Sequence, residues 1–202
     1  MFNDRAATRQ LKRYRRKGPS RTTRLLVDHL EAAGVQGLTL LDIGGGVGAI
    51  QHALVEAGAR RVTGVDASPA YLSVVREEAD RLGYGARAEQ HLGDFVERAE
   101  ALDEADIVTL DRVLCCYPAM EKLVRLSAER ARKLYAVVFP RDDWWVRALL
   151  VLPNLFMRLT RNPFRVFVHP SMAVEQAALA EGLRRRYRKK TAIWQVVVYE
   201  RP

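Results

Sequence analysis

A glycine-rich turn stands near the start of the chain, in the segment LLDIGGGVGAI at residues 40–50. Its glycines are Gly44, Gly45, Gly46 and Gly48, and the acid Asp42 lies two residues before the first of them. A glycine turn between a first buried strand and its helix lets a ligand approach the backbone closely. In an open parallel sheet, this position lies at the carboxyl ends of the strands. The segment therefore predicts a ligand site.

Two classes of nucleoside cofactor use such a turn, and both patterns fit. The dinucleotide pattern G-x-G-x-x-A is matched by Gly44, Gly46 and Ala49. An acid, one residue and then G-x-G-x-G, the pattern of S-adenosylmethionine sites, is matched by Asp42, Gly44, Gly46 and Gly48. A carboxylate repels a pyrophosphate but attracts the ammonium and sulfonium of S-adenosylmethionine. Asp42 therefore favours S-adenosylmethionine, with an NAD-dependent oxidoreductase as an alternative that calorimetric titration of both cofactors would decide.

Further acids follow the next predicted strands. Asp66 lies 22 residues after Gly44 and is placed to accept hydrogen bonds from a ribose, which suits either cofactor. Asp94 could accept from an adenine amino group, and Asp111 ends the fourth strand at the same crevice. The cofactor-binding residues predicted from these motifs are Asp42, Ile43, Gly44, Gly45, Gly46, Gly48, Asp66, Ala67, Ser68, Gly93, Asp94, Phe95, Asp111 and Arg112.

The elements that would position these residues alternate between strand and helix from about residue 20 onward. We predict strands at 38–43, 61–65, 87–91, 105–110 and 134–139, with helices at 20–33, 49–57 and 68–82 and another that Pro118 begins. This order indicates a parallel sheet with right-handed crossovers. Beyond it we predict one or two helices at 143–160 interrupted at Pro153, a helix at 173–181, and closing strands at 183–190 and 191–200.

The bulk composition is that of one ordinary folded domain. The chain has 202 residues, of which 49% are hydrophobic and 28% charged. It contains no apolar run of about 18 residues and no signal-peptide core, so we expect a cytoplasmic protein. The adjacent Cys115 and Cys116 are expected to be reduced thiols, and no residue pattern indicates a metal site.

The net charge of +9 is unevenly distributed. No acid stands between Asp4 and Asp28, a stretch that holds nine basic residues, and a second basic cluster lies at 184–190. Such surfaces can attract nucleic acid, anionic lipid or an acidic small substrate, or they can be plain solvated faces.

The strand-end motifs resemble those of class I S-adenosylmethionine-dependent methyltransferases. DIGGGVG resembles the glycine motif of that class, VDAS its ribose acid and GDF its adenine-side motif. The resemblance implies an α/β, Rossmann-like fold with a seven-stranded, mostly parallel sheet, an antiparallel last strand and helices on both faces. The two predicted closing strands agree with it.

A narrower likeness is carried by RYRRKG, VTLDRVLCCYP and RVFVHP, which are similar to small bacterial methyltransferases grouped with the magnesium-protoporphyrin O-methyltransferases. In that group an N-terminal segment closes over the cofactor, and its tyrosine lies near the methyl donor, which implies this role for Tyr14. We therefore expect residues 1–34 to form a basic helical segment that covers the cofactor site. Residues 35–202 would form the methyltransferase domain, with a helical lid insertion at about 141–168. The likeness weakens in the last third, so a porphyrin substrate is not carried over.

The methyl acceptor should lie above the ends of the fourth and fifth strands, because methyl transfer mainly requires positioning and exclusion of water. The predicted catalytic residues are His169 as a base, Tyr117 and Arg112. Arg112 or Arg165 could hold an acidic substrate as a bidentate fork. The residues expected to line the acceptor are Asp111, Arg112, Cys116, Tyr117, Arg141, Trp144, Trp145, Phe164, Arg165 and His169.

The predicted function is methylation of a small-molecule acceptor, with an oxygen atom of a hydrophobic or acidic substrate favoured. A carboxylate acceptor needs no general base, whereas a phenol, amine or hydroxyl usually does. The alternative is an RNA methyltransferase or RNA-binding module that uses the basic ends. Against it, no N-P-P-Y or D-P-P-Y motif follows the fourth strand. The apolar segment from Trp144 onward suits a lid, a helix in peripheral contact with a membrane, or core packing. The sequence carries no signal for the oligomeric state.

Overall fold

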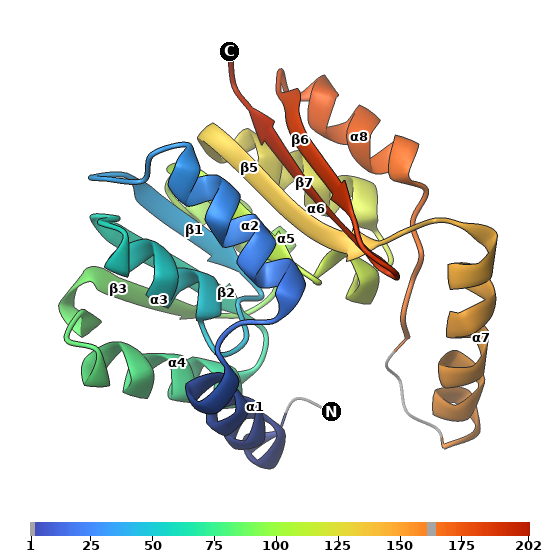
Figure 1. The fold of residues 1–202 in the computed structure, drawn as a ribbon, viewed down its shortest axis with the longest axis horizontal. Coiled ribbons are helices and arrows are strands. Elements are labelled where there is room, and N and C mark those ends of the chain that lie inside the picture. The colour runs from blue at the N-terminus through green and yellow to red at the C-terminus, as the bar shows by residue number, and fades with distance from the viewer. Residues whose placement is uncertain (1–2, 161–164) are drawn as a thin grey trace.

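The computed structural model describes residues 3–160 and 165–202, and within these ranges seven strands form one sheet (Figure 1). The strands are β1 (Thr39–Ile43), β2 (Arg61–Asp66), β3 (Ala88–Leu92), β4 (Ala105–Asp111), β5 (Ala131–Pro140), β6 (Arg184–Lys190) and β7 (Trp194–Glu200). Their order is β3-β2-β1-β4-β5-β7-β6, and β1 to β5 are parallel. Strand β7 runs antiparallel to both of its neighbours. The predicted fold class is confirmed.

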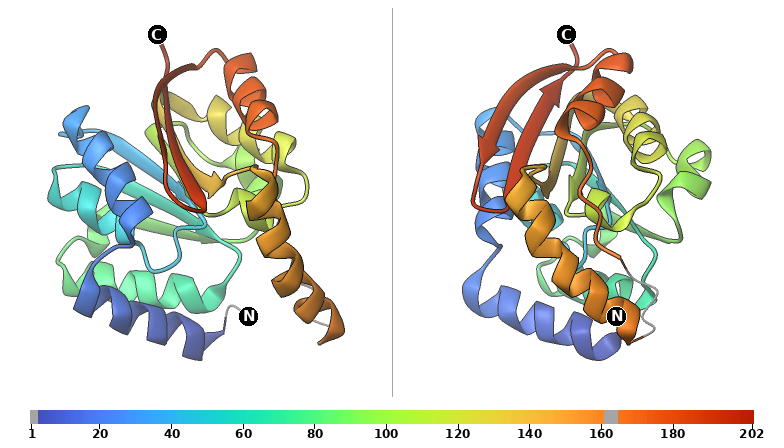
Figure 2. Two further views of the ribbon diagram at one scale, coloured as in Figure 1. Left: turned by 45° about the vertical axis from the view of Figure 1, so that its right-hand side comes forward. Right: turned by 90° about the vertical axis from the view of Figure 1, so that its right-hand side faces the viewer.

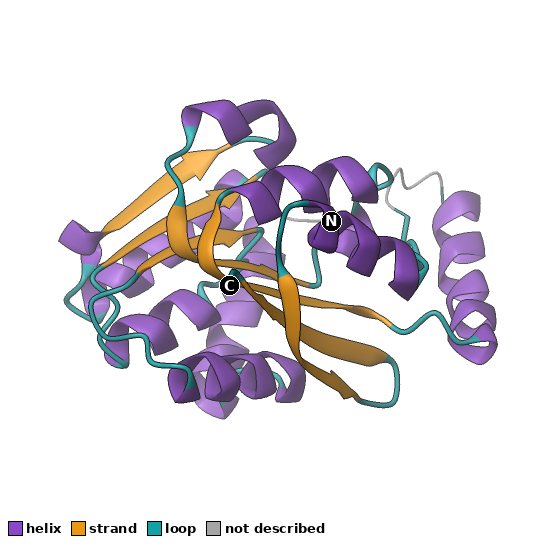
Figure 3. Cartoon of the chain, turned by 90° about the horizontal axis from the view of Figure 1, so that it is seen from above, coloured by secondary structure: helices purple, strands orange, loops and turns teal. Residues whose placement is uncertain are grey.

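Helices cover both faces of the sheet (Figure 3). They are α1 (Asp4–Lys17), α2 (Arg21–Ala32), α3 (Ala49–Glu56), α4 (Pro69–Arg81), α5 (Phe95–Arg98), α6 (Met120–Glu129), α7 (Trp144–Leu159) and α8 (Ser171–Ala180), with the 3-10 turns η1 (Gly85–Arg87), η2 (Ala99–Ala101) and η3 (Leu114–Cys116). The side chains of Ser20 and Ser68 cap α2 and α4, as serine before a helix predicts. Helices α2, α3 and α4 pack on one face, and α5, α6 and α8 on the other.

The core forms because the central strands are apolar on both sides. In β5, Tyr135 and Val137 face the helices α6 and α8, whereas the alternate residues Ala136 and Val138 face α2 and α3. Each fully buried side chain of Val or Leu size contributes about 1.5–3 kcal/mol to the stability of the folded state. The sheet is therefore a rigid support whose strand ends hold the site residues in fixed positions.

Two boundary predictions differ from the structure. The predicted interruption at Pro153 is wrong, because α7 is one continuous helix from Trp144 to Leu159. A proline removes a single backbone donor, and the flanking Leu, Ala, Arg and Met residues have high helix propensity. The helix expected to begin at Pro118 begins at Met120, because the chain first forms the turn η3 after β4.

Helices α1 and α7 lie at the periphery (Figure 2). Ala7 and Leu11 of α1 pack against Tyr71 and Val74 of α4. Helix α7 follows β5 and projects from the body before the chain returns to α8. Within residues 3–160 and 165–202, no helix has the length and hydropathy needed to cross a bilayer.

Candidate cofactor and acceptor site

The glycine turn connects β1 to α3 through left-handed backbone conformations. Gly44, Gly46 and Gly48 have φ angles of 63°, 58° and 76°, which only glycine adopts without strain. The amide of Gly44 donates to the carbonyl of Val65 at the end of β2 over 2.7 Å. The turn is thereby fixed at the carboxyl end of the sheet and leaves the backbone around Gly46 half-exposed.

Asp42 lies beneath this turn and is completely buried. Its carboxylate accepts hydrogen bonds from the Thr109 hydroxyl over 2.6 Å and from the Gln51 amide over 3.1 Å. A Cβ atom at Gly45 would stand 2.1 Å from Oδ2 of Asp42, so the carboxylate and the turn fill the same space. Burial raises the pKa of Asp42 to about 6, and the charges of Asp111 and Asp66 act in the same direction.

Asp66, the predicted ribose acid, ends β2 and is half-buried. One carboxylate oxygen accepts from the backbone amide of Ser68 over 2.8 Å, and the other accepts from the amide of Gly46 over 3.4 Å. Asp66 therefore joins the glycine turn to the start of α4. Burial raises its pKa above the usual aspartate value.

Asp94, just after β3, forms a hydrogen bond with Tyr117, which follows the turn η3. Asp94 caps α5 by accepting from the amide of Val96 over 2.8 Å, and its second oxygen accepts from the Tyr117 hydroxyl over 3.0 Å. Burial, followed by this hydrogen bond, raises the pKa of Tyr117 to about 12. The phenol therefore stays protonated at neutral pH and acts as a donor rather than a base.

Asp111 and Arg112 form a third group with a residue from the N-terminal segment. Asp111 accepts from the Thr23 hydroxyl over 2.5 Å and from Nε of Arg112 over 3.0 Å. The guanidinium carbon of Arg112 lies 6.0 Å from the ring centroid of Trp194, a cation–π distance. Arg112 also has a φ of 63°, a conformation that costs a non-glycine residue energy and often marks functional positions.

The strand ends thus gather three carboxylates. Asp42, Asp66 and Asp111 end or nearly end β1, β2 and β4, and the charges of the other two raise the pKa of Asp42. A cationic ligand placed beside them would relieve this repulsion, whereas a pyrophosphate would increase it. The residues present therefore fit a positively charged nucleoside better than a dinucleotide.

His169, the predicted base, uses one ring nitrogen to hold the chain. Its Nε2 lies 2.9 Å from the carbonyl of Leu114 and 3.0 Å from that of Tyr117. Carbonyl oxygens only accept hydrogen bonds, so Nε2 must carry the proton and only Nδ1 is left to act as a base. The amide of Phe167 also donates to the carbonyl of Cys115. Together these bonds fasten the segment 165–170 to η3.

Replacing His169 with alanine is expected to lower the free energy of unfolding by about 1–3 kcal/mol, because two carbonyl groups lose their common donor. Urea denaturation would measure the change. His91→Ala, which alters a half-buried histidine of β3, is the matched control. If both variants unfold at the wild-type urea concentration, His169 does not fasten this segment.

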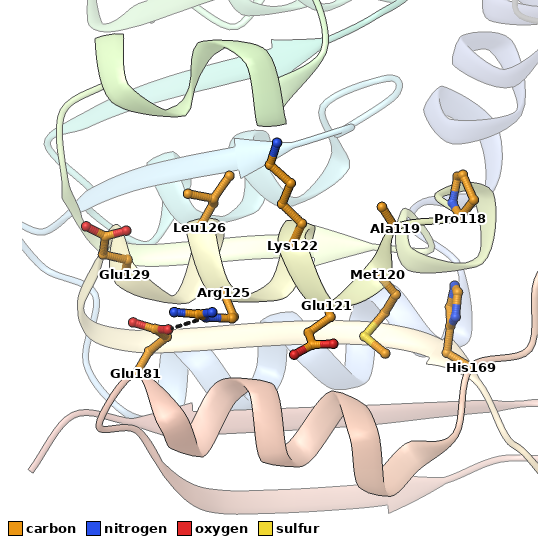
Figure 4. A pocket seen from close by; sticks show the side chains of 10 residues that line it. All are labelled: Pro118, Ala119, Met120, Glu121, Lys122, Arg125, Leu126, Glu129, His169 and Glu181. Atoms are coloured by element: carbon orange, nitrogen blue, oxygen red, sulfur yellow. Dashed lines mark hydrogen bonds and ion pairs between the residues drawn. The ribbon is translucent and has the colours of Figure 1, made fainter.

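Two hollows of about 730 Å³ each lie elsewhere on the protein, away from the three carboxylates. One is an open groove along α6 and α8, with His169 at one end and the Arg125–Glu181 ion pair farther along (Figure 4). The other holds Tyr14, whose ring centroid is 5.5 Å from that of His52. The residues that line these two hollows include neither Asp66 nor the glycine turn. The role of Tyr14 beside the methyl donor stays a prediction.

The remaining predicted residues lie in different surroundings. Ile43 and Phe95 have their side chains in the core, so only their backbones are at the strand ends. Ala67 is exposed beside Asp66. Trp144 is 80% exposed on α7, and Phe164 lies outside the described residues.

Sequence reasoning missed four residues that support the site, namely Thr23, Gln51, His52 and Thr109. Buried His52 contacts the carbonyl of Val47 through Nε2 over 2.8 Å and hydrogen-bonds the Tyr84 hydroxyl through Nδ1. It therefore holds the turn at Val47, in addition to the contact that Asp42 makes beneath Gly45. For Gln51 and His52 the available signal was the pair of polar residues in the first part of α3, just after the turn.

Comparison with known protein families agrees with this geometry. The family described as "Methyltransferase domain" matches residues 35–147, more than half of the chain. The chain therefore belongs to the methyltransferase domain family. Fold and family together define it as a class I S-adenosylmethionine-dependent methyltransferase, which confirms the predicted class and cofactor.

Individual relatives match at modest identity. Ribosomal protein L11 methyltransferase from Klebsiella pneumoniae is 32% identical over 141 residues, which are 62% of this chain and 47% of that protein. The chain spans less than half the length of the curated relatives it matches.

Magnesium protoporphyrin IX methyltransferase from Synechocystis PCC 6803, solved with bound SAH, has a TM-score of 0.74 and 20% identity, covering 97% of this chain and 96% of that one. An O-methyltransferase family protein from Burkholderia thailandensis has a TM-score of 0.71 and 19% identity, covering 90% and 56%. At these identities, the two solved structures show that this chain has the same fold as they do.

Proposed function

We propose that this protein binds S-adenosylmethionine at the ends of β1, β2 and β4 and methylates an oxygen atom of a small acidic or hydrophobic molecule. The observation that carries the proposal is the cluster of Asp42, Asp66 and Asp111 around a glycine turn. Asp66 would accept from the ribose hydroxyls and Asp94 from the adenine amino group. The cofactor, when bound, supplies a methyl group on a sulfonium carbon. The protein's part is to orient the acceptor and exclude water.

A carboxylate is the acceptor that the surrounding residues favour. Tyr117 stays protonated because its pKa is raised to about 12, and His169 already uses one ring nitrogen for backbone carbonyls. A carboxylate needs no base, and Arg112 is close enough to the strand ends to attract it. The name of one solved relative, the O-methyltransferase family protein from Burkholderia thailandensis, supports transfer to oxygen.

Two parts of the chain are proposed to enclose the site. For residues 1–34, Thr23 contacts Asp111, and the Gln10 amide nitrogen lies 3.7 Å from where a Cβ of Gly46 would stand. For the proposed lid at about 141–168, the Asn154 side chain exchanges two hydrogen bonds with the backbone of Val166, which ties α7 to the segment that carries His169.

The test has two parts. Calorimetric titration with S-adenosylmethionine and with NAD should show binding of the first alone. Incubation with methyl-labelled S-adenosylmethionine and a cell extract should then label a small molecule whose methyl group is lost under conditions that hydrolyse esters. A label retained in protein or nucleic acid would overturn the proposed acceptor, and binding of NAD alone would overturn the proposed binding of S-adenosylmethionine at the strand ends.

The affinity for S-adenosylmethionine should fall as the pH drops through about 6. Asp42 has a raised pKa of about 6, so it is ionised at neutral pH and becomes protonated below that value. Protonation removes a negative charge near the bound cation, and we expect affinity to fall by about threefold to tenfold between roughly pH 7 and pH 5. Calorimetry at several pH values measures this.

The matched variant is Asp42→Asn, which keeps the volume and one acceptor oxygen for Thr109. Its affinity should be lower at neutral pH and should vary less with pH, since Asp66 is then the main remaining titrating acid. Equal slopes for the wild type and the variant would show that Asp42 does not produce the pH dependence.

One of the two basic surfaces that the RNA alternative would use is partly neutralised. In β6, Arg184 and Arg186 both pair with Glu200, and Arg185 pairs with Glu175. Two acids therefore offset part of the charge of the six basic residues at 184–190, and Arg188 bonds the neutral side chain of Gln195. RNA affinity that is strong at low salt and falls steeply with salt would favour the alternative.

A further inference from the structure

Helix α7 exposes an unusually large apolar face. Val146 and Met157 are buried toward the body, whereas Leu152, Phe156 and Leu159 on the opposite side are 69%, 67% and 74% exposed. At about 100° per residue, the exposed large apolar side chains cover an arc of about 160°. They are Trp144, Leu149, Val151, Leu152, Leu155, Phe156 and Leu159. A contiguous apolar face of this kind marks an interaction surface.

The charges beside this face are all positive. Arg147 and Arg158 are exposed and lie on neighbouring positions around the helix, at one border of the apolar arc. The helix contains no acidic residue. Leucine and aromatic side chains bordered by arginine are the composition of helices that lie in a membrane interface.

Helix α1 adds a second cationic surface at the same end of the molecule. Its apolar side, Ala7 and Leu11, is buried against α4. The outward side carries the exposed cations Arg5, Arg9, Lys12, Arg13 and Arg16. Helix α1 and the far end of α7 both lie at the lower end of the protein in the two views of Figure 2. A flat surface at this end could therefore contact α1 and the last turns of α7.

We propose that this end of the protein docks on an anionic lipid bilayer. The exposed face of α7 enters the boundary between headgroups and acyl chains, and the outward cations of α1 contact the lipid phosphates. Charge argues for this partner over a second copy of the chain, because both helices are basic and would repel their counterparts in a symmetric pair. The proposal rests on the surface alone and is independent of the proposed methyl transfer.

Cosedimentation with two kinds of vesicle tests the docking. Vesicles of equal parts phosphatidylcholine and phosphatidylglycerol should bind the full-length protein, and salt should weaken the binding, whereas phosphatidylcholine alone should bind it poorly. Leu152→Ser with Phe156→Ser should weaken binding to the anionic vesicles by about tenfold or more. The control is Leu82→Ser with Leu179→Ser, which changes exposed leucines at the end of α4 and in α8 and should bind as the wild type does.

A second pair of variants tests the charge contribution. Arg9→Gln with Arg13→Gln should weaken binding to anionic vesicles by about tenfold or more, whereas Lys189→Gln with Lys190→Gln, at the end of β6, should have little effect. Equal binding by all variants would overturn the proposal. The proposal would also be overturned by a second pattern of results. In that pattern the wild type does not bind vesicles and is a dimer by light scattering, and the Leu152 and Phe156 changes dissociate the dimer. In that case the face joins two copies.

Discussion

Asp66→Ala is expected to weaken S-adenosylmethionine binding about a hundredfold, as calorimetry would measure. The carboxylate is half-buried and accepts hydrogen bonds from the amides of Gly46 and Ser68. Its removal also deletes the charged acceptor proposed for the ribose hydroxyls. It also releases the glycine turn from the start of α4. Both effects weaken binding of the cofactor, and the lost negative charge makes the strand ends less attractive to a cation.

Two further variants separate these effects. Asp66→Asn keeps one oxygen that can accept from the Ser68 amide but loses the charge, so its affinity should lie between those of the wild type and the alanine variant. Asp103→Ala removes an exposed acid near the opposite ends of the strands and should leave binding unchanged. Wild-type affinity in the Asp66→Ala protein would show that Asp66 is not the ribose acid.

The second large effect is expected from Gly45→Ala. The added Cβ would stand 2.1 Å from Oδ2 of Asp42 and 3.1 Å from the Gln51 amide nitrogen. Both atoms belong to buried side chains that hydrogen-bond each other, so neither can move aside without breaking that contact. We expect a loss of about 3 kcal/mol in the free energy of unfolding, which corresponds to a fall of roughly 6–12 °C in Tm.

Gly37→Ala is the control for this change. Gly37 has a φ of 74°, but no atom lies within 4 Å of its added Cβ, so only backbone strain opposes the substitution. That strain costs about 1 kcal/mol. Equal stabilities for the two variants, measured by thermal and urea unfolding, would contradict the view that Asp42 and the turn fill one space.

The structure changes the way in which Asp42 favours a cationic cofactor. The sequence argument places this acid beside the ligand, but in the structure Asp42 is completely buried and its oxygens are occupied by Thr109 and Gln51. Its charge acts through a short stretch of low-dielectric protein, and its side chain supports the turn. Asp66, which is half-buried, is the acid with direct access to a ligand.

The sequence by itself determined the strands, most of the helices and the place of the ligand site. Those features depend on signals that are local in the chain, such as apolar strands, the serine caps Ser20 and Ser68, and the glycines after Asp42. Each signal fixes the backbone of its own segment, and the rules of parallel sheets then bring the strand ends together.

Only the tertiary structure decided which side chains act together. Thr23 reaches Asp111 across 88 positions of the chain, and His169 reaches Leu114 across 55. Spacing in the sequence says nothing about such contacts, because they depend on how separate elements pack. The exposure of α7 is a similar case, since an apolar helix has the same sequence whether it is buried in the core or faces solvent.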